Sequence, residues 1–223
     1  MSPAPSPVPI PLAKKPRLQI TDLSFGYPGR ELFHQFSADI APGITLVRGG
    51  DGLGKSSLLK VVAGVLAPHS GRICINGIDL QTRATHRQTH LFWMDPRSAA
   101  FDQLTPLDYF AVQRGRFVSF DDAILACGTD RLGLRDHLYK PLFMLSTGSK
   151  RKVWLAAAFA SGAEVTLLDE PLAALDVPST AFITAWMLEA VSKAADAGHR
   201  IWVWADYTAP SGLPLAQVID LGD

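Results

Sequence analysis

The fold of this chain is decided by Gly49-Gly50-Asp51-Gly52-Leu53-Gly54-Lys55-Ser56. The stretch fits G-x-x-x-x-G-K-[ST], a pattern whose glycines let backbone N–H groups curl around phosphate oxygens. Thr45-Leu46-Val47 before it is typical of a strand, and the residues from Ser57 onward begin a helix whose N-terminal dipole favours an anion. Strand, glycine turn and helix together predict a phosphate-binding loop. The alternative, a glycine-rich turn that binds nothing, leaves Lys55 and Ser56 unexplained.

The loop also predicts where the chemistry takes place. We expect Lys55 to reach the β- and γ-phosphates of a nucleotide and Ser56 to offer its hydroxyl to Mg²⁺. An apolar run ends downstream in Asp169-Glu170, which is typical of a buried parallel strand with acids at its carboxyl end. Asp169 is therefore the expected Mg²⁺ residue, and Glu170 is placed to polarise a water for attack on the γ-phosphate. The alternative for these two acids is helix capping in a loop.

Composition narrows the class of protein. A length of 223 residues predicts one domain, or one domain with a lobe. Lys+Arg and Asp+Glu both number 21, so no net charge attracts nucleic acid. The two cysteines, Cys74 and Cys127, fit neither a metal spacing nor a disulfide framework. The longest apolar run, Val153–Ala160, is too short to span a bilayer. Residues 1–16 are rich in proline and predict a disordered tail, followed by a nucleotide-binding domain over 17–223.

The alternation of strand and helix patterns predicts an α/β fold with a mostly parallel sheet. Periodicity is weak between about Asp95 and Lys140, which indicates a helical subdomain, about 95–160, inserted in the core. We expect strands at 18–23, 33–40, 45–47, 72–75, 90–94, 165–169, 201–204 and 218–221. We expect helices after the phosphate loop up to Pro68, over 147–160, and from Pro178 to a cap at Gly198.

One further motif names a family. Leu145-Ser146-Thr147-Gly148-Ser149 resembles the signature motif of ATP-binding cassette (ABC) ATPases, which reads Leu-Ser-Gly-Gly-Gln and is followed by basic residues. Thr147 replaces the first glycine and Ser149 the glutamine, while Ser146 keeps the hydroxyl and Gly148 the close backbone approach. In the family this motif meets ATP bound to the other subunit. The alternative is an ordinary capped helix start with a solvated basic face at Lys150–Lys152.

Further stretches resemble the family in its order along nearly the whole chain past the tail. Leu23–Tyr27 looks like the aromatic loop, which implies that Tyr27 stacks on adenine; the alternative is a half-buried edge-strand tyrosine. Ala173–Asp176 looks like the D-loop, which implies that Asp176 lies at a dimer interface. The resemblance also implies an antiparallel β-subdomain. The implied nucleotide contacts are Tyr27, Gly49, Gly50, Asp51, Gly52, Leu53, Gly54, Lys55, Ser56 and Ser57.

Two positions depart from the family. Asp95 stands where the Q-loop carries a glutamine, and a carboxylate still suits Mg²⁺ but adds negative charge near phosphates. Ala205-Asp206-Tyr207 follows the strand after which the family has its switch histidine. His199 lies at the other end of that strand, roughly 20 Å away. These departures predict slow hydrolysis.

The resemblance implies the ATP-binding, ATP-hydrolysing subunit of a transporter, of compact bacterial type such as the haem-exporter cassettes. Two copies would close head to tail on two Mg-ATP, with Gly49–Ser57 of one facing Ser146–Gly148 of the other. An integral-membrane permease would contact the region around Asp95–Phe110, and the protein would be cytoplasmic, peripheral on the inner face of the membrane. The second subunit is either identical or different. One alternative is a degraded cassette that binds ATP with little hydrolysis; a soluble cassette acting on DNA or ribosomes is disfavoured by the neutral charge.

Overall fold

The computed structural model describes residues 15–93, 95–197 and 200–222. Nearly all of the expected N-terminal tail, together with Met94, Gly198 and His199, lies outside the described residues. Pro16, expected in the tail, is buried two residues before the first strand. No helix within the described residues combines the length and the hydropathy needed to cross a membrane.

The centre of the molecule is a parallel sheet of five strands in the order β6-β7-β8-β3-β9. Its strands are β3 (Gly43–Arg48), β6 (Leu91–Trp93), β7 (Val165–Asp169), β8 (Ile201–Ala205) and β9 (Leu215–Asp220). β7 and β8 are apolar on both faces and buried, as expected for inner strands of a covered parallel sheet. The predicted parallel sheet is confirmed.

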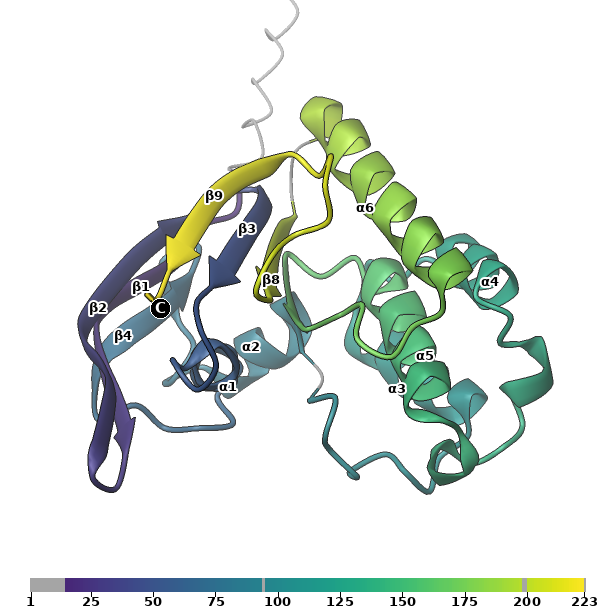
Figure 1. Cartoon of the computed structure of the whole chain (residues 1–223), viewed down its shortest axis with the longest axis horizontal. Helices are drawn as coiled ribbons and strands as arrows, with labels where there is room; N and C mark the ends of the chain where they lie inside the picture. The colour runs from purple at the N-terminus through teal and green to yellow at the C-terminus, as the bar shows by residue number, and fades with distance from the viewer. Residues whose placement is uncertain (1–14, 94, 198–199, 223) are drawn as a thin grey trace, which may run out of the picture.

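A second sheet is antiparallel, in the order β2-β1-β4-β5. Its strands are β1 (Leu18–Tyr27), β2 (Arg30–Ile40), β4 (Ser70–Ile75) and β5 (Ile78–Asp79). Figure 1 shows this sheet on one side of the molecule and helices α3 to α6 on the other. The α/β fold with an antiparallel part is therefore confirmed.

The helices are α1 (Lys55–Val62), α2 (Ala84–His90), α3 (Pro106–Arg116), α4 (Asp122–Arg131), α5 (Thr147–Ala160) and α6 (Val177–Ala197), with short 3-10 turns at Arg135–His137 and Leu142–Met144. α1 packs against β7 and β8, and α5 packs against α3 and α4. The limits expected for α5 and β7 agree with the structure.

The helix after the phosphate loop is shorter than predicted. Gly64 has a φ of +71°, and Val65 donates its N–H to Lys60 O while Gly64 donates to Val61 O. This left-handed glycine follows the C-cap Ala63, so α1 ends at Val62, six residues before Pro68. Leu66 and the exposed Val65, which the apolar pattern placed on the helix, follow it.

Residue His90 was wrongly assigned to a strand. It is the last residue of α2, a seven-residue helix with no buried side chain, and β6 begins at Leu91. Because α2 carries no apolar face, it leaves no periodic signal in the sequence.

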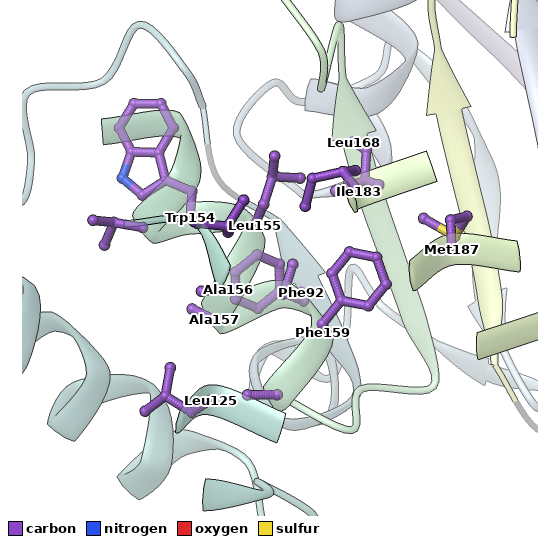
Figure 2. Close-up of a cluster of buried hydrophobic side chains, with 14 of the residues drawn as sticks. Phe92, Leu125, Trp154, Leu155, Ala156, Ala157, Phe159, Leu168, Ile183 and Met187 are labelled. Atoms are coloured by element: carbon purple, nitrogen blue, oxygen red, sulfur yellow. The ribbon is translucent and has the colours of Figure 1, made fainter. Parts of the chain in front are cut away.

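The larger hydrophobic core joins α5 and α6 to the sheet (Figure 2). The ring of Phe159 on α5 stacks on Trp186 of α6 with centroids 4.0 Å apart. Trp202 and Trp204, alternate residues of β8, are both buried in this core. The core fixes β7 and β8, whose ends carry the site.

Candidate functional site

The site lies where three neighbouring parallel strands end. Asp169 at the end of β7 is paired with Ala205 at the end of β8, and Ala205 is paired with Val47 of β3. Carboxyl ends of parallel strands meet at one edge of a sheet, where ligands of such sheets bind. The phosphate loop and the acid pair, far apart in sequence, therefore meet at this edge.

The phosphate loop has the backbone that its glycines predict. Gly54 has a φ of +103°, and a Cβ there would lie 2.9 Å from the Phe33 ring. Gly54 is the N-cap of α1 and gives it no side-chain cap. Among the described residues, the N–H groups of Gly54, Lys55 and Ser56 have no acceptor. Unpaired N–H groups at a helix N-terminus fit a phosphate.

Two further groups at the loop are held by protein atoms. Lys55 Nζ donates to Gly49 O at 2.6 Å and to Gly50 O at 3.0 Å, folding the ammonium back over the loop. Ser56 Oγ donates to Asp169 Oδ1 at 3.1 Å, which ties the loop to the end of β7. These are the two residue types, hydroxyl and carboxylate, that a Mg²⁺ ion bridging to phosphates requires.

Burial raises the pKa of Asp169, and the charges of Glu170 and Asp95 raise it further. The hydrogen bond from Ser56 and the charge of Arg97 act in the opposite direction. Burial makes the charged form of this carboxylate unfavourable, and a divalent cation bound to it would stabilise that form. The residues present therefore fit a Mg²⁺ ion.

Glu170 lines the same pocket as Lys55 and Ser56. Its backbone is left-handed, with a φ of +43°, and its N–H donates to Ala205 O at 2.8 Å. A non-glycine residue in this conformation costs about 1–3 kcal/mol and is typical of functional positions. The fold thus aims a carboxylate at the pocket in spite of local strain.

The pocket, of about 550 Å³, joins the loop to the antiparallel sheet. Tyr27 at the end of β1 lines it, is 47% exposed, and lies with its hydroxyl 3.2 Å from Ser57 Oγ. Its ring meets Phe25 edge to face. An exposed ring beside a phosphate loop is free to stack on a base, and this role of Tyr27 remains a prediction.

Three pocket residues were missed from the sequence: Arg30, Leu32 and Arg97. Arg30 and Leu32 reach the pocket because β2 runs beside β1, a pairing that places Tyr27 opposite Arg30. Arg97 comes from the turn after β6. The only signal for Arg97 is its closeness in sequence to Asp95, which the family resemblance singles out.

The carboxylate of Asp95 contacts one backbone amide and one cation. Its Oδ1 accepts the N–H of Arg97 at 2.9 Å, and its Oδ2 lies 3.4 Å from Lys60 Nζ on α1. The carboxylate therefore braces a turn against the helix that follows the phosphate loop.

The signature-like stretch lies apart from this pocket, since none of Leu145–Ser149 lines it. Ser146 is the N-cap of α5 and accepts the N–H of Ser149 at 3.1 Å. A Cβ on Gly148 would lie 2.4 Å from Ala174 O, so only glycine fits there. The stretch is thus packed against the D-loop-like segment Ala173–Asp176.

The basic residues after it do not form a solvated face. Arg151 is buried and donates to Ala173 O, Lys150 pairs with Asp102 at 2.6 Å, and Lys152 pairs with Asp176 at 2.5 Å. Hydrogen bonds from Lys152 and then Ser179 hold the pKa of Asp176 below its usual range. The side chains of Lys150–Lys152 therefore stabilise the surface around the signature-like stretch through contacts within the same chain.

The switch position holds no imidazole among the described residues. Ala205 is buried, and Asp206 donates its N–H to Val47 O and accepts the N–H of Tyr207 at its own carboxylate. Asp206 is one of three acids whose charge acts on Arg151, after Glu170 and Asp169. The end of β8 is therefore followed by a carboxylate, that of Asp206, where the family has an imidazole.

Comparison with known proteins agrees with this geometry. A model of the ABC transporter family matches residues 33–173. The cytochrome c biogenesis ATP-binding export protein CcmA of Aromatoleum aromaticum is 32% identical over 213 residues, 93% of this chain and 96% of that protein. The CcmA protein of Pseudomonas savastanoi pv. phaseolicola is 34% identical over 162 residues, 72% of this chain and 76% of that protein. A solved ATP-binding subunit of an ABC transporter superposes with a TM-score of 0.70 at 22% identity, covering 84% of this chain and 78% of that one, which shows the fold alone.

Proposed function

This chain belongs to the ABC transporter family and is an ATP-binding protein and ATPase of it, and we propose that it drives a membrane permease. In this proposal two subunits bind ATP, close on each other, and by closing move the permease; hydrolysis lets them part. The observation that carries it is the hydrogen bond to Asp169 from Ser56, which lines a pocket together with Lys55 and Glu170.

The phosphate loop binds the nucleotide in this proposal. Lys55 exchanges the carbonyls of Gly49 and Gly50 for phosphate oxygens, which are stronger acceptors because they are charged. The N–H groups at the start of α1 can bind phosphate without breaking a protein hydrogen bond, since none of the described residues accepts from them. When bound, Mg²⁺ neutralises charge developing on the phosphates, and Ser56 and Asp169 are the residues that would hold it.

Glu170 acts as the base. Its carboxylate takes a proton from the attacking water, whose oxygen bonds to the terminal phosphorus as the bond to the bridging oxygen of ADP breaks. The strained backbone of Glu170 supports this role, because the strain is offset only by packing that fixes one orientation.

The signature-like stretch completes the site from a second subunit. Ser146 is exposed at the start of α5, Gly148 and Ser149 are half-buried behind it, and none of the three lines the pocket of its own chain. The tight approach of Gly148 to Ala174 O couples this stretch to the D-loop-like segment. A second subunit that closes on the pocket would present both together.

The permease contact is the segment around Asp95–Phe110. Arg97 of this segment lines the pocket, while Leu107 on α3 is 40% exposed. The segment therefore runs from the nucleotide to an outward apolar side chain. The proposed location is peripheral, on the cytoplasmic face of the membrane.

A second candidate is a cassette that binds ATP and turns it over slowly beside a more active partner. Among the residues that the structure describes, no histidine lines the pocket, and Asp206 adds negative charge at the end of β8. Both features weaken the positioning of water and γ-phosphate in this chain.

Affinity purification from detergent-solubilised membranes tests the main proposal. We expect a membrane-embedded subunit to copurify, and we expect the pair to release phosphate from Mg-ATP. Lys55→Ala should abolish release, whereas Lys140→Ala, on an exposed lysine outside the pocket, should not.

Three outcomes count against the main proposal. Sedimentation with ribosomes in place of a membrane subunit would reject transport. Phosphate release that survives Lys55→Ala would reject the site. Release equally absent from wild type and Glu170→Gln, alone and with the partner, would favour the second candidate.

A further inference from the structure

Arg97 is a cation in the phosphate pocket that the binding motifs do not use. Its side chain is exposed and lines the pocket together with Lys55, Ser56 and Glu170. Within residues 15–93, 95–197 and 200–222, the guanidinium makes no hydrogen bond or ion pair. An arginine held beside a phosphate loop with all five donors free is available to a ligand.

The backbone of Arg97 is fixed from two directions. Asp95 Oδ1 accepts its N–H at 2.9 Å, and Asp95 O accepts the N–H of Ser98 at 3.0 Å. The other carboxylate oxygen of Asp95 lies 3.4 Å from Lys60 Nζ, with both side chains about three-quarters covered. Because Lys60 belongs to α1, Arg97 is braced to the same helix that carries Lys55 and Ser56.

The charge of Arg97 reaches the acids at the end of β7. It lowers the pKa of Asp169, against the effects of Glu170 and Asp95. The other cation near these acids, Arg151, is buried and donates to Ala173 O. Arg97 is therefore a pocket cation with free donors whose charge also acts on Asp169 at the end of β7.

We propose that Arg97 binds the terminal phosphate of ATP from within the same chain, and that Asp95 positions it there. The inference rests on the proposed ATP site. A planar guanidinium pairs with two phosphate oxygens at once and stabilises the charge that develops as the terminal phosphoryl group is transferred. Arg97 would supply at this phosphate a positive contact that the switch position, with Ala205 and Asp206, does not.

ADP lacks the phosphate that Arg97 contacts, so Arg97 sets the preference for ATP over ADP. The experiment is calorimetric titration of the full chain with Mg-ADP and with a Mg-bound, non-hydrolysable ATP analogue. For Arg97→Ala we expect the affinity for the analogue to fall about tenfold, as for loss of a charged hydrogen bond, and that for ADP to fall less than about twofold. Arg97→Lys keeps the charge without the fork and should lie between.

Arg83→Ala is the matched control. Arg83 is an exposed arginine at the N-cap of α2, outside the pocket, and neither affinity should change. Melting temperatures without nucleotide check that each variant is folded. If Arg97→Ala is poorly folded, the ratio of the two affinities for Arg97→Lys decides instead.

The inference is overturned if Arg97→Ala weakens analogue and ADP equally, or changes neither. The second result is what an exposed arginine that does not touch the nucleotide would give. Failure of the proposed ATP site would give a different titration result. In that case wild type would bind neither nucleotide, or Lys55→Ala would bind the analogue as tightly as wild type.

Discussion

The phosphate loop and the signature-like stretch are both glycine-dependent helix starts, and they differ in what their own chain offers them. Around Gly49–Ser57 the chain gathers a pocket with a lysine, a hydroxyl and the carboxylate of Glu170, and the hydroxyl is bonded to Asp169 at the end of β7. Around Leu145–Ser149 it supplies only support, through Ala174, Arg151 and the Lys152–Asp176 pair. The first region is an open pocket lined by reactive side chains, whereas the second packs against its own chain and contributes none of the described residues that line this pocket. This difference is what a site divided between two subunits predicts.

The largest effect should come from the equipped region. Glu170→Gln keeps the shape of the side chain and removes the base, so we expect phosphate release to fall about a thousandfold while ATP binding persists. Phosphate release by the purified protein, with and without its membrane partner, measures this. Glu189→Gln, on an exposed position of α6, is the control and should leave release unchanged.

The division itself is tested by mixing two damaged subunits. Lys55→Ala disables the phosphate loop, and Gly148→Ala drives a Cβ to within 2.4 Å of Ala174 O. Each alone should be inactive. In a two-fold dimer an equal mixture restores one intact site in half of the dimers, so about a quarter of wild-type release should return. Mixtures that stay inactive, although Gly148→Ala alone binds ATP, would argue that the site is not shared.

A smaller effect should follow from loosening the brace at Asp95. Asp95→Asn keeps an acceptor for the N–H of Arg97 and removes the ion pair with Lys60. We expect affinity for a non-hydrolysable ATP analogue to fall about threefold, with ADP nearly unaffected, because a partly buried ion pair is of modest strength. An equal change for both nucleotides would mean that the turn shapes the whole pocket.

The smallest effect concerns stability. Burial raises the pKa of Asp169 above its ordinary value, so the folded state holds this proton more tightly than the unfolded state. Its contribution to stability is present below the ordinary pKa and is lost as pH rises through the raised one. Asp169→Asn should therefore raise the melting temperature of the nucleotide-free protein at neutral pH by about 1–2 °C. Thermal unfolding at pH 4 and pH 7.5 measures this, and the gain should vanish at the lower pH.

Local sequence predicts the fold well wherever packing and capping agree with the apolar pattern. Ser146 as N-cap and a buried apolar run give α5 its limits, and an unbroken apolar run gives β7. The predicted end of α1 was wrong because the apolar pattern continues through Val65 and Leu66, whereas the left-handed conformation of Gly64 ends the helix before them. α2 was missed because a helix without a buried side chain leaves no pattern to detect.

The residues of the candidate site were likewise predicted only in part. The motif residues Lys55 and Ser56 were predicted, and the structure brings them to Asp169 and Glu170 because parallel strands end at one edge. Arg97 was not predicted. It reaches the pocket only through a turn that Asp95 and Lys60 hold, and such tertiary contacts leave no trace in the spacing of residues.

The base of the phosphate loop is closed by the far end of the sequence. Gly50 donates its N–H to Gly222 O at 3.1 Å, Leu221 donates to Arg48 O at 2.9 Å, and β9 pairs with β3 throughout. During synthesis on the ribosome, residues 49–56 emerge well before these partners. The nucleotide cradle is therefore completed only after β9 has been made.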